Sequence, residues 1–210
     1  MIENMIGSNS VTISGKIASP LEFSHEFCGE KFYKFILNVG RLSENFDSIP
    51  VTISERLLID GHLTVDSFVK IMGQFRSYNH VDSESTKLIL TVFAQDIELL
   101  DSTSKIHNPN QIFLDGFLCK PAIYRVTPLG REISDLLVAI NRQYGKSDYI
   151  PCITWGRNAR YCEQLKVGNR LKLWGRIQSR NYQKRLDDNN VISKTAYEVS
   201  VTKLEIIPCS

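Results

Sequence analysis

The segment from 171 to 184 alternates between apolar and polar side chains. Its odd positions are small or apolar: Leu171, Leu173, Gly175 and Ile177. Its even positions are polar or aromatic: Lys172, Trp174, Arg176, Gln178, Arg180, Tyr182 and Lys184. Because successive side chains of a strand point to opposite faces, the pattern predicts a strand with one buried face and one basic face that bears two rings. Cations pair with phosphates and rings stack on unpaired bases, so such a face is typical of a single-stranded nucleic-acid groove. The alternative is a half-buried strand whose rings are covered by another element.

The two halves of the chain repeat one another. The segment 11–17 aligns with 112–118, and 49–51 with 150–152, both at an offset of 101 residues. The segment 69–74 aligns with 171–176 at an offset of 102, and 97–98 with 204–205 at an offset of 107. A repeat of this length predicts two copies of one fold.

Each copy is predicted to be a small barrel. In the second copy, enrichment in β-branched and aromatic residues predicts strands near 111–118, 132–142, 149–155, 170–182 and 196–206. A short helix is predicted over 158–165, and residues 55–60 take its place in the first copy. Five strands with a helix between the third and fourth are the plan of an OB-fold. The fold class is therefore all-β, with two tandem OB-fold five-stranded barrels.

The polar segment 101–110 is predicted to link two domains, 1–105 and 106–210. The net charge of +2 conceals a difference between them. The first has 9 Lys and Arg against 14 Asp and Glu, and the second has 16 against 9, so their net charges are −5 and +7. A site for a polyanion is expected in the second domain. The acidic first domain is expected to be architectural or to contact proteins.

The sequence offers no pattern typical of an enzyme, a metal site or a membrane protein. The five cysteines, at positions 28, 119, 152, 162 and 209, lack the C-x-x-C spacing of a zinc site and suit reduced thiols in the cytoplasm. The four histidines are scattered, and Gly145-Lys146-Ser147 lacks the first glycine of a phosphate-binding loop. No apolar run is long enough to cross a bilayer. We expect a cytoplasmic protein with no catalytic residues, no cofactor and no metal.

The segments 148–156 and 175–182 carry a resemblance to a known family. Tyr149 opens one predicted strand, Trp155 closes it before a glycine, and Tyr182 follows Gly175-Arg176-Ile177-Gln178-Ser179-Arg180. In this order and spacing the second half resembles the bacterial single-stranded DNA-binding protein family over most of 111–206. The resemblance implies that these three rings stack on bases. It also implies non-enzymatic, largely sequence-independent binding of single-stranded DNA in replication, recombination or repair.

The candidate binding residues follow from the alternation, the charge and this resemblance. Trp174 joins Tyr149, Trp155 and Tyr182 as a candidate stacking residue. The candidate phosphate contacts are Arg125, Arg142, Lys146, Lys172, Arg176, Arg180, Lys184 and Arg185. The first half resembles the family less, because Ser48, Ser54 and His80 stand where the second half has rings. Arg76 and Tyr78 still offer one cation and one ring there.

The resemblance also bears on partners. Family members commonly assemble four OB-folds, so a chain with two is expected to form a homodimer. Their acidic C-terminal tip recruits replication and repair proteins, whereas this sequence ends at Ile206-Ile207-Pro208-Cys209-Ser210 after a predicted strand, and recruitment by that route is not expected. Two alternatives stay open. One is a primosomal or mobile-element accessory or adaptor protein that uses its OB-folds for protein contacts, and the other is RNA binding.

Overall fold

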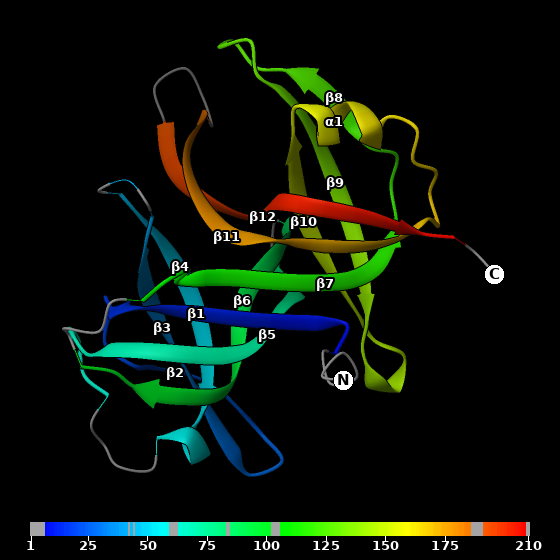
Figure 1. Ribbon diagram of the computed structural model, residues 1–210. Coiled ribbons are helices and arrows are strands. Elements are labelled where there is room, and N and C mark those ends of the chain that lie inside the picture. The colour runs from blue at the N-terminus through cyan, green and yellow to red at the C-terminus, as the bar shows by residue number, and fades with distance from the viewer. Residues whose placement is uncertain are drawn as a thin grey trace.

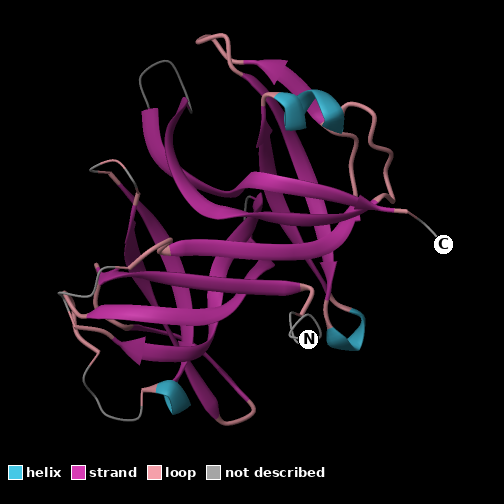
Figure 2. Cartoon of the chain, viewed as in Figure 1, coloured by secondary structure: helices cyan, strands magenta, loops and turns pink. Residues whose placement is uncertain are grey.

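The computed structural model describes residues 7–41, 43, 45–58, 63–82, 85–101, 106–185 and 191–208. The N-terminal half contains β1 (Asn9–Ile17), β2 (Glu22–Phe27), β3 (Glu30–Gly40), β4 (Phe46–Ser54), the 3-10 turn η1 (Glu55–Leu57), β5 (Phe68–Asp82) and β6 (Ser85–Leu99). The C-terminal half contains β7 (Asn110–Leu118), β8 (Ile123–Val126), β9 (Glu132–Asn141), η2 (Gln143–Gly145), β10 (Ser147–Trp155), α1 (Arg157–Cys162), β11 (Arg170–Arg185) and β12 (Val191–Ile207). Strands dominate, and the helical elements are short (Figure 2).

Each half closes into a barrel. In the first half, β3, β4, β6, β5 and β1 are hydrogen-bonded in that order, and a further pairing between β1 and β3 closes the ring. The second half repeats the arrangement as β9, β10, β12, β11 and β7, closed by the pairing of β7 with β9. The predicted pair of five-stranded OB-fold barrels is confirmed.

The predicted second-copy helix, 158–165, is present as α1 over Arg157–Cys162. The other elements agree with the predicted ranges except in three places. The edge strands β2 and β8, which pair with β3 and β9 outside the barrels, were not predicted. The hairpin of β11 and β12 is longer than predicted and extends to Arg185 and Val191. The predicted first-copy helix is only the single 3-10 turn η1, and residues 59 and 60 lie outside the described part of the chain.

A glycine occupies the same place in each barrel because another backbone passes close to it. At Gly73 and Gly175 a β-bulge shifts the register, and an added Cβ would collide with the carbonyl oxygens of Phe93 and Ser200. The barrel interiors are filled by aliphatic side chains such as Ile71 and Leu173, which are fully buried. These glycines and the aliphatic core explain why the repeat is visible in the sequence.

The two barrels are joined by a direct strand pairing, and β1 and β7 lie side by side between them (Figure 1). The antiparallel register places Asn9 opposite Leu114 and Asn110 opposite Ile13. Under the repeat offset of 101 these two pairs exchange, so the halves are related by an approximate twofold axis near Val11 and Ile112.

No helix in the described ranges is long and apolar enough to span a membrane.

Candidate nucleic-acid interface

The outer face of β10, β12 and β11 carries most of the predicted binding residues. On β11 the even positions from Lys172 to Tyr182 point away from a core in which Leu171, Leu173 and Ile177 are buried, as the alternation predicts. The register places Arg176 opposite Ser200 of β12, and the Trp155 indole of β10 donates a hydrogen bond to the Ser200 hydroxyl at 3.2 Å. Three strands therefore contribute to one surface, which we call the C-face.

Three rings of the C-face are accessible. Tyr149 is 45% exposed, Trp155 37% and Tyr182 38%. Large rings at such exposure are available to stack on a flat partner. Tyr149 and Trp155 lie near opposite ends of β10. Both side chains face outward, because the side chains at the alternate positions between them, Ile150, Cys152 and Thr154, point into the core.

The fourth predicted ring, Trp174, is partly covered. The Phe113 ring of β7 packs against it with a centroid distance of 5.1 Å, and the Lys203 ammonium of β12 lies 4.4 Å from its ring centroid. Both contacts follow from the register, in which Trp174 faces Phe113 on one side and Lys203 on the other. Trp174 thus has less open surface for stacking than the alternation alone suggests.

Carboxylates hold two of the predicted cations in place, Arg180 on the C-face and Arg125 on the edge strand β8. Arg125 of β8 donates to both carboxylate oxygens of Asp135 at 2.7 and 3.2 Å, and this hydrogen bonding raises the pKa of Arg125. Glu198 accepts a hydrogen bond from Gln178 at 2.6 Å and lies 3.9 Å from the guanidinium of Arg180, which is 59% exposed. These ion pairs orient the guanidiniums but leave donors free toward solvent.

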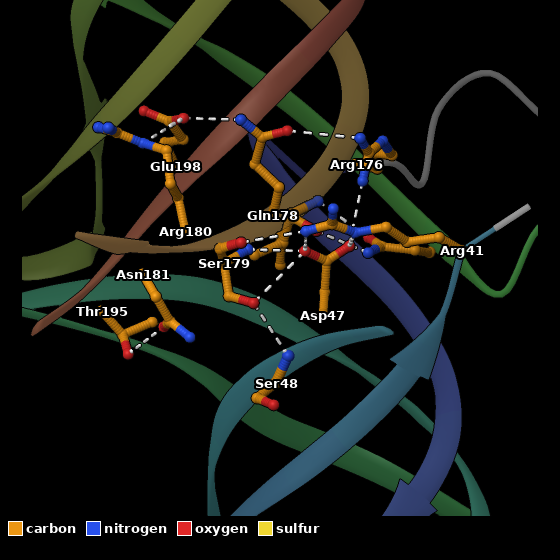
Figure 3. Close-up of polar contacts among 12 residues, drawn as sticks. Arg41, Asp47, Ser48, Arg176, Gln178, Ser179, Arg180, Asn181, Thr195 and Glu198 are labelled. Carbon is orange, nitrogen blue, oxygen red and sulfur yellow. Dashed lines mark hydrogen bonds and ion pairs between the residues drawn. The ribbon is translucent and has the colours of Figure 1, made fainter. Parts of the chain in front are cut away.

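Arg176 is engaged across the junction between the two barrels (Figure 3). Its guanidinium donates at 3.0 Å to Asp47 of β4, whose side chain is only 1% exposed. Arg41 donates to the same carboxylate at 2.9 and 2.5 Å, which raises the pKa of Arg41. The Ser179 amide also donates to Asp47 at 2.8 Å, and the Ser179 hydroxyl accepts from the Ser48 amide at 3.0 Å. We call this set the Asp47 junction.

The approximate twofold axis generates a second junction. Asp148 of β10 accepts a hydrogen bond from the Ser77 amide at 2.7 Å, and Ser77 accepts one from the Tyr149 amide at 2.7 Å. The Arg142 guanidinium lies 3.1 Å from Asp148, but its geometry does not make a hydrogen bond. Burial raises the pKa of Asp148, against the Ser77 hydrogen bond and the charges of Arg142 and Arg76. The predicted cation Arg142 therefore lies at this Asp148 junction, facing the N-terminal barrel.

The remaining predicted cations are lysines and one arginine. Lys146 follows η2 and is exposed, and Lys172 is half-buried on the outer side of β11. Lys184 and Arg185 end β11, and their side chains lie outside the described residues.

Of the residues of the two junctions, only Arg142 and Arg176 were predicted from the sequence, and both as phosphate contacts. Arg41, Asp47 and Ser77 recur as Arg142, Asp148 and Ser179 at the repeat offsets of 101 and 102. Polar residues that stay identical in two otherwise different copies were a usable signal for a contact that both copies make. We found no group of three or more His, Cys, Asp or Glu that could hold a metal ion in the described ranges, and burial raises the pKa of the Cys152 thiol.

The comparisons with known proteins point to one family. Residues 109–207 match the model of the single-strand binding protein family. The C-terminal half of the chain is therefore similar to this family. Single-stranded DNA-binding protein A of Bacillus subtilis (strain 168) is 35% identical over 81 residues, which cover 35% of this chain and 47% of that protein. Single-stranded DNA-binding protein 2 of Listeria innocua is 33% identical over 81 residues, 35% of this chain and 51% of that protein. The chain spans about half the length of these family members.

Solved structures extend the similarity to both barrels. The wild-type single-stranded DNA binding protein from Thermus aquaticus covers 97% of this chain and 95% of its own, with a TM-score of 0.73 and 19% identity. That likeness shows the shared two-barrel fold. The dimeric N-terminal domain of the PriB protein from Thermoanaerobacter tencongensis covers 45% of this chain at 55% identity, with a TM-score of 0.41 that adds nothing to the fold assignment.

Proposed function

We propose that the chain is a non-enzymatic protein that binds single-stranded DNA with little sequence preference, and that it serves DNA replication, recombination or repair. The observation that carries the proposal is the C-face, where the exposed rings of Tyr149, Trp155 and Tyr182 accompany guanidiniums held by carboxylates. Rings stack on any base and cations contact the backbone, so this combination suits a strand of arbitrary sequence. The match of residues 109–207 to the single-strand binding protein family also supports single-stranded DNA as the ligand.

The two domains have different roles in this proposal. Residues 106–210 form the principal binding domain, in agreement with their net charge of +7. Residues 1–105 have an architectural role, because Arg41 and Asp47 supply one of the two junctions that fix the C-terminal barrel. Replication or repair proteins that contact the acidic first domain are the partners we expect.

Intrinsic tryptophan fluorescence tests the binding proposal. Both tryptophans lie in the C-terminal half, Trp155 accessible on the C-face and Trp174 under Phe113 and Lys203. Oligo(dT) should quench the intact protein, and quenching should persist in Trp174→Phe and largely disappear in Trp155→Phe. Equal quenching by duplex DNA would overturn the preference for single strands. Tighter binding of the matching RNA would favour the RNA alternative.

The intact protein is proposed to be a homodimer that presents four barrels. The support is the two barrels per chain together with the four-barrel assemblies that the family resemblance implies. Light scattering should give about twice the chain mass of 23.9 kDa. A monomer at micromolar concentration would contradict this assembly.

A further inference from the structure

Two free strand edges lie at opposite ends of the molecule. β2 and β8 are the first and last strands of the hydrogen-bonded order, and among the described residues each pairs with one neighbour, β3 or β9. Figure 1 shows β8 at the top and β2 toward the bottom. The repeat offset of 101 aligns Glu22–Phe27 with residues 123–128, so the approximate twofold axis relates the two edges. Because alternate amide and carbonyl groups of an edge strand point away from its partner, each edge can pair with a further strand.

Both edges expose large apolar side chains. Phe23 and Phe27 of β2 and Ile123 and Val126 of β8 are each more than half exposed, and Leu129, in the turn after β8, is more exposed still. No described element of the same chain therefore covers them. An apolar strand edge in this state tends to pair with another chain, so both edges are candidate contacts with a partner.

The two edges carry opposite charges. β2 contains Glu22 and Glu26 and no lysine or arginine, whereas β8 and the turn after it contain Arg125 and Arg131 and no aspartate or glutamate. Two glutamates against two arginines give local net charges of −2 and +2, with histidine neutral. The compensating charges belong to β3 and β9, which lie one strand further from each edge. A strand added at either end therefore meets one sign of charge first.

The existing ion pairs of these edges are at the surface. The Lys34 ammonium lies 3.4 Å from the Glu22 carboxylate, and Arg125 donates to Asp135 at 2.7 Å. All four side chains are more than one-third exposed. Exposed pairs of this kind contribute little to stability, so Glu22 and Arg125 can exchange partners at small cost.

Charge selects among the three ways in which two copies of the chain can join these edges. Pairing of β2 with β2 brings glutamates together, and pairing of β8 with β8 brings arginines together. Like charges across a strand pair are destabilising. Pairing of β2 with β8 brings glutamates to arginines and packs phenylalanines against aliphatic side chains, so it is the favoured arrangement.

We propose that the acidic edge β2 of one chain pairs with the basic edge β8 of a second copy. The contact is heterologous, because two different surfaces meet, and each joined pair keeps one free β2 and one free β8. It therefore continues into rows or rings of chains, in contrast to the closed homodimer of the proposed function. Neither the contact nor its test requires DNA.

The contact should be weak and sensitive to salt. β2 has six residues and β8 has four, so few hydrogen bonds form, and salt screens the exposed charges. Sedimentation velocity of the intact chain should give an average mass that rises with protein concentration at low salt and hardly rises at high salt. An average mass that is independent of concentration at low salt would overturn the proposal.

Reversal of the charges identifies the two edges. Glu22→Lys with Glu26→Lys makes both edges basic, and Arg125→Glu with Arg131→Glu makes both acidic, so each double variant should lose the rise in mass. A chain with all four substitutions again has one edge of each sign and should recover it. The two like-with-like contacts stay repulsive in this chain, so recovery is specific to β2 against β8. A folded fourfold variant that showed no rise would contradict the contact.

Two further variants serve as controls. Arg170→Glu is matched to Arg125, because Arg170 also donates to both oxygens of an aspartate and is similarly exposed, but it lies on β11. It should keep the rise in mass, and its loss would show that the location of the charge is unimportant. Glu22→Gln with Glu26→Gln, changes at exposed side chains, serves if a reversed chain has a lowered melting temperature. It should flatten the salt dependence of the rise, and an unchanged salt dependence would exclude these glutamates from the contact.

Discussion

The two barrels keep the same junction and differ in the faces beside it. Each supplies a buried aspartate that accepts an amide hydrogen bond from a serine of the other barrel, Asp47 from Ser179 and Asp148 from Ser77. The outer faces differ. The C-face has three exposed rings and cations paired with carboxylates, whereas the equivalent face of β4, β5 and β6 has the Arg76 guanidinium 3.9 Å from the centroid of the Phe93 ring. The aspartate, arginine and serine that recur in both junctions are the same, whereas the residues that face solvent have diverged.

The net charge of a domain is therefore a poor guide to the charge of one of its surfaces. Residues 1–105 carry −5 overall. Yet the described residues that line a pocket over β2 to β6 include cations and hydroxyl groups and no carboxylate. Residues 106–210 carry +7, yet Glu198 lies within the C-face and Asp135 lies beside Arg125 on the neighbouring strand β9. On the C-face the Glu198 carboxylate orients Arg180. In the N-terminal barrel Arg76 instead lies over the Phe93 ring and donates to the Gln74 side chain.

The largest effect should come from breaking a junction. Asp47→Ala leaves the buried Ser179 amide without its acceptor and two arginines without their carboxylate, and it should lower the free energy of unfolding by about 3 kcal/mol. Asp148→Ala should cost less, because Asp148 accepts one amide hydrogen bond and neither nearby arginine, Arg142 or Arg76, donates an aligned hydrogen bond to it. Urea unfolding of the two variants measures the difference. Equal losses would show that the second arginine at Asp47 contributes nothing.

The next effect concerns the rings of the C-face. Trp155→Ala or Tyr182→Ala should weaken binding of oligo(dT) by about 1–3 kcal/mol with little change in salt dependence, because ring-on-base contact releases no counterions. Tyr161→Ala is the matched control, since Tyr161 is a similarly exposed ring on α1. Titrations at several salt concentrations measure both quantities. Normal binding by a folded Trp155→Ala variant would mean that the C-face is not the main site.

A smaller effect should separate the two arginines of β11. Arg180 is 59% exposed beside Glu198, so Arg180→Ala should reduce the slope of log K against log salt by about 0.7 and hardly change stability. Arg176 donates to the buried Asp47, so Arg176→Ala should lower stability as well. Thermal unfolding alongside the salt titration makes the distinction. If Arg176→Ala changed only the salt slope, its ion pair with Asp47 would have no role in folding.

The smallest effect is a pH dependence of the Asp148 junction. Burial raises the pKa of Asp148 in the folded chain, so the folded state binds its proton more readily than the unfolded state. Stability from this residue should therefore rise as the pH falls through the folded pKa toward the ordinary aspartate range, and decline again as the pH increases. The unfolding free energy of the unaltered chain minus that of Asp148→Asn, followed against pH, isolates the effect. A difference that declined on acidification would reverse the direction of the pKa shift.

The barrels were predictable because closely packed interiors constrain the sequence locally. Alternation along β11 placed Arg180 and Tyr182 outside, and the aligned segments 69–74 and 171–176 predicted two copies of one fold. The edge strand β8 was missed because it is four residues long and mostly exposed, which gives no alternation to detect.

The parts of the site that escaped prediction depend on contacts between distant strands. Nothing in the alternation of β11 reveals that Phe113 covers Trp174 or that Asp47 binds Arg176. Phe93 on β6 was overlooked because the ring that corresponds to it in the C-terminal barrel lies on β10, the counterpart of β4, and so looks lost when residues are compared one by one. Pairs of facing positions, compared between the copies, would have shown the exchange.

The pairing of β1 with β7 has a consequence for the polarity of a bound strand. A twofold axis at Val11 and Ile112 turns one barrel face into the other by rotation. A DNA strand that passes directly across this axis meets one barrel in the 5′ to 3′ sense and the other in the 3′ to 5′ sense. Two identical faces could not both fit such a strand, because its sugars and bases would be presented in reverse. A strand bound by both faces in the same sense would therefore have to loop between them, whereas a strand that passes directly needs two faces with different side chains.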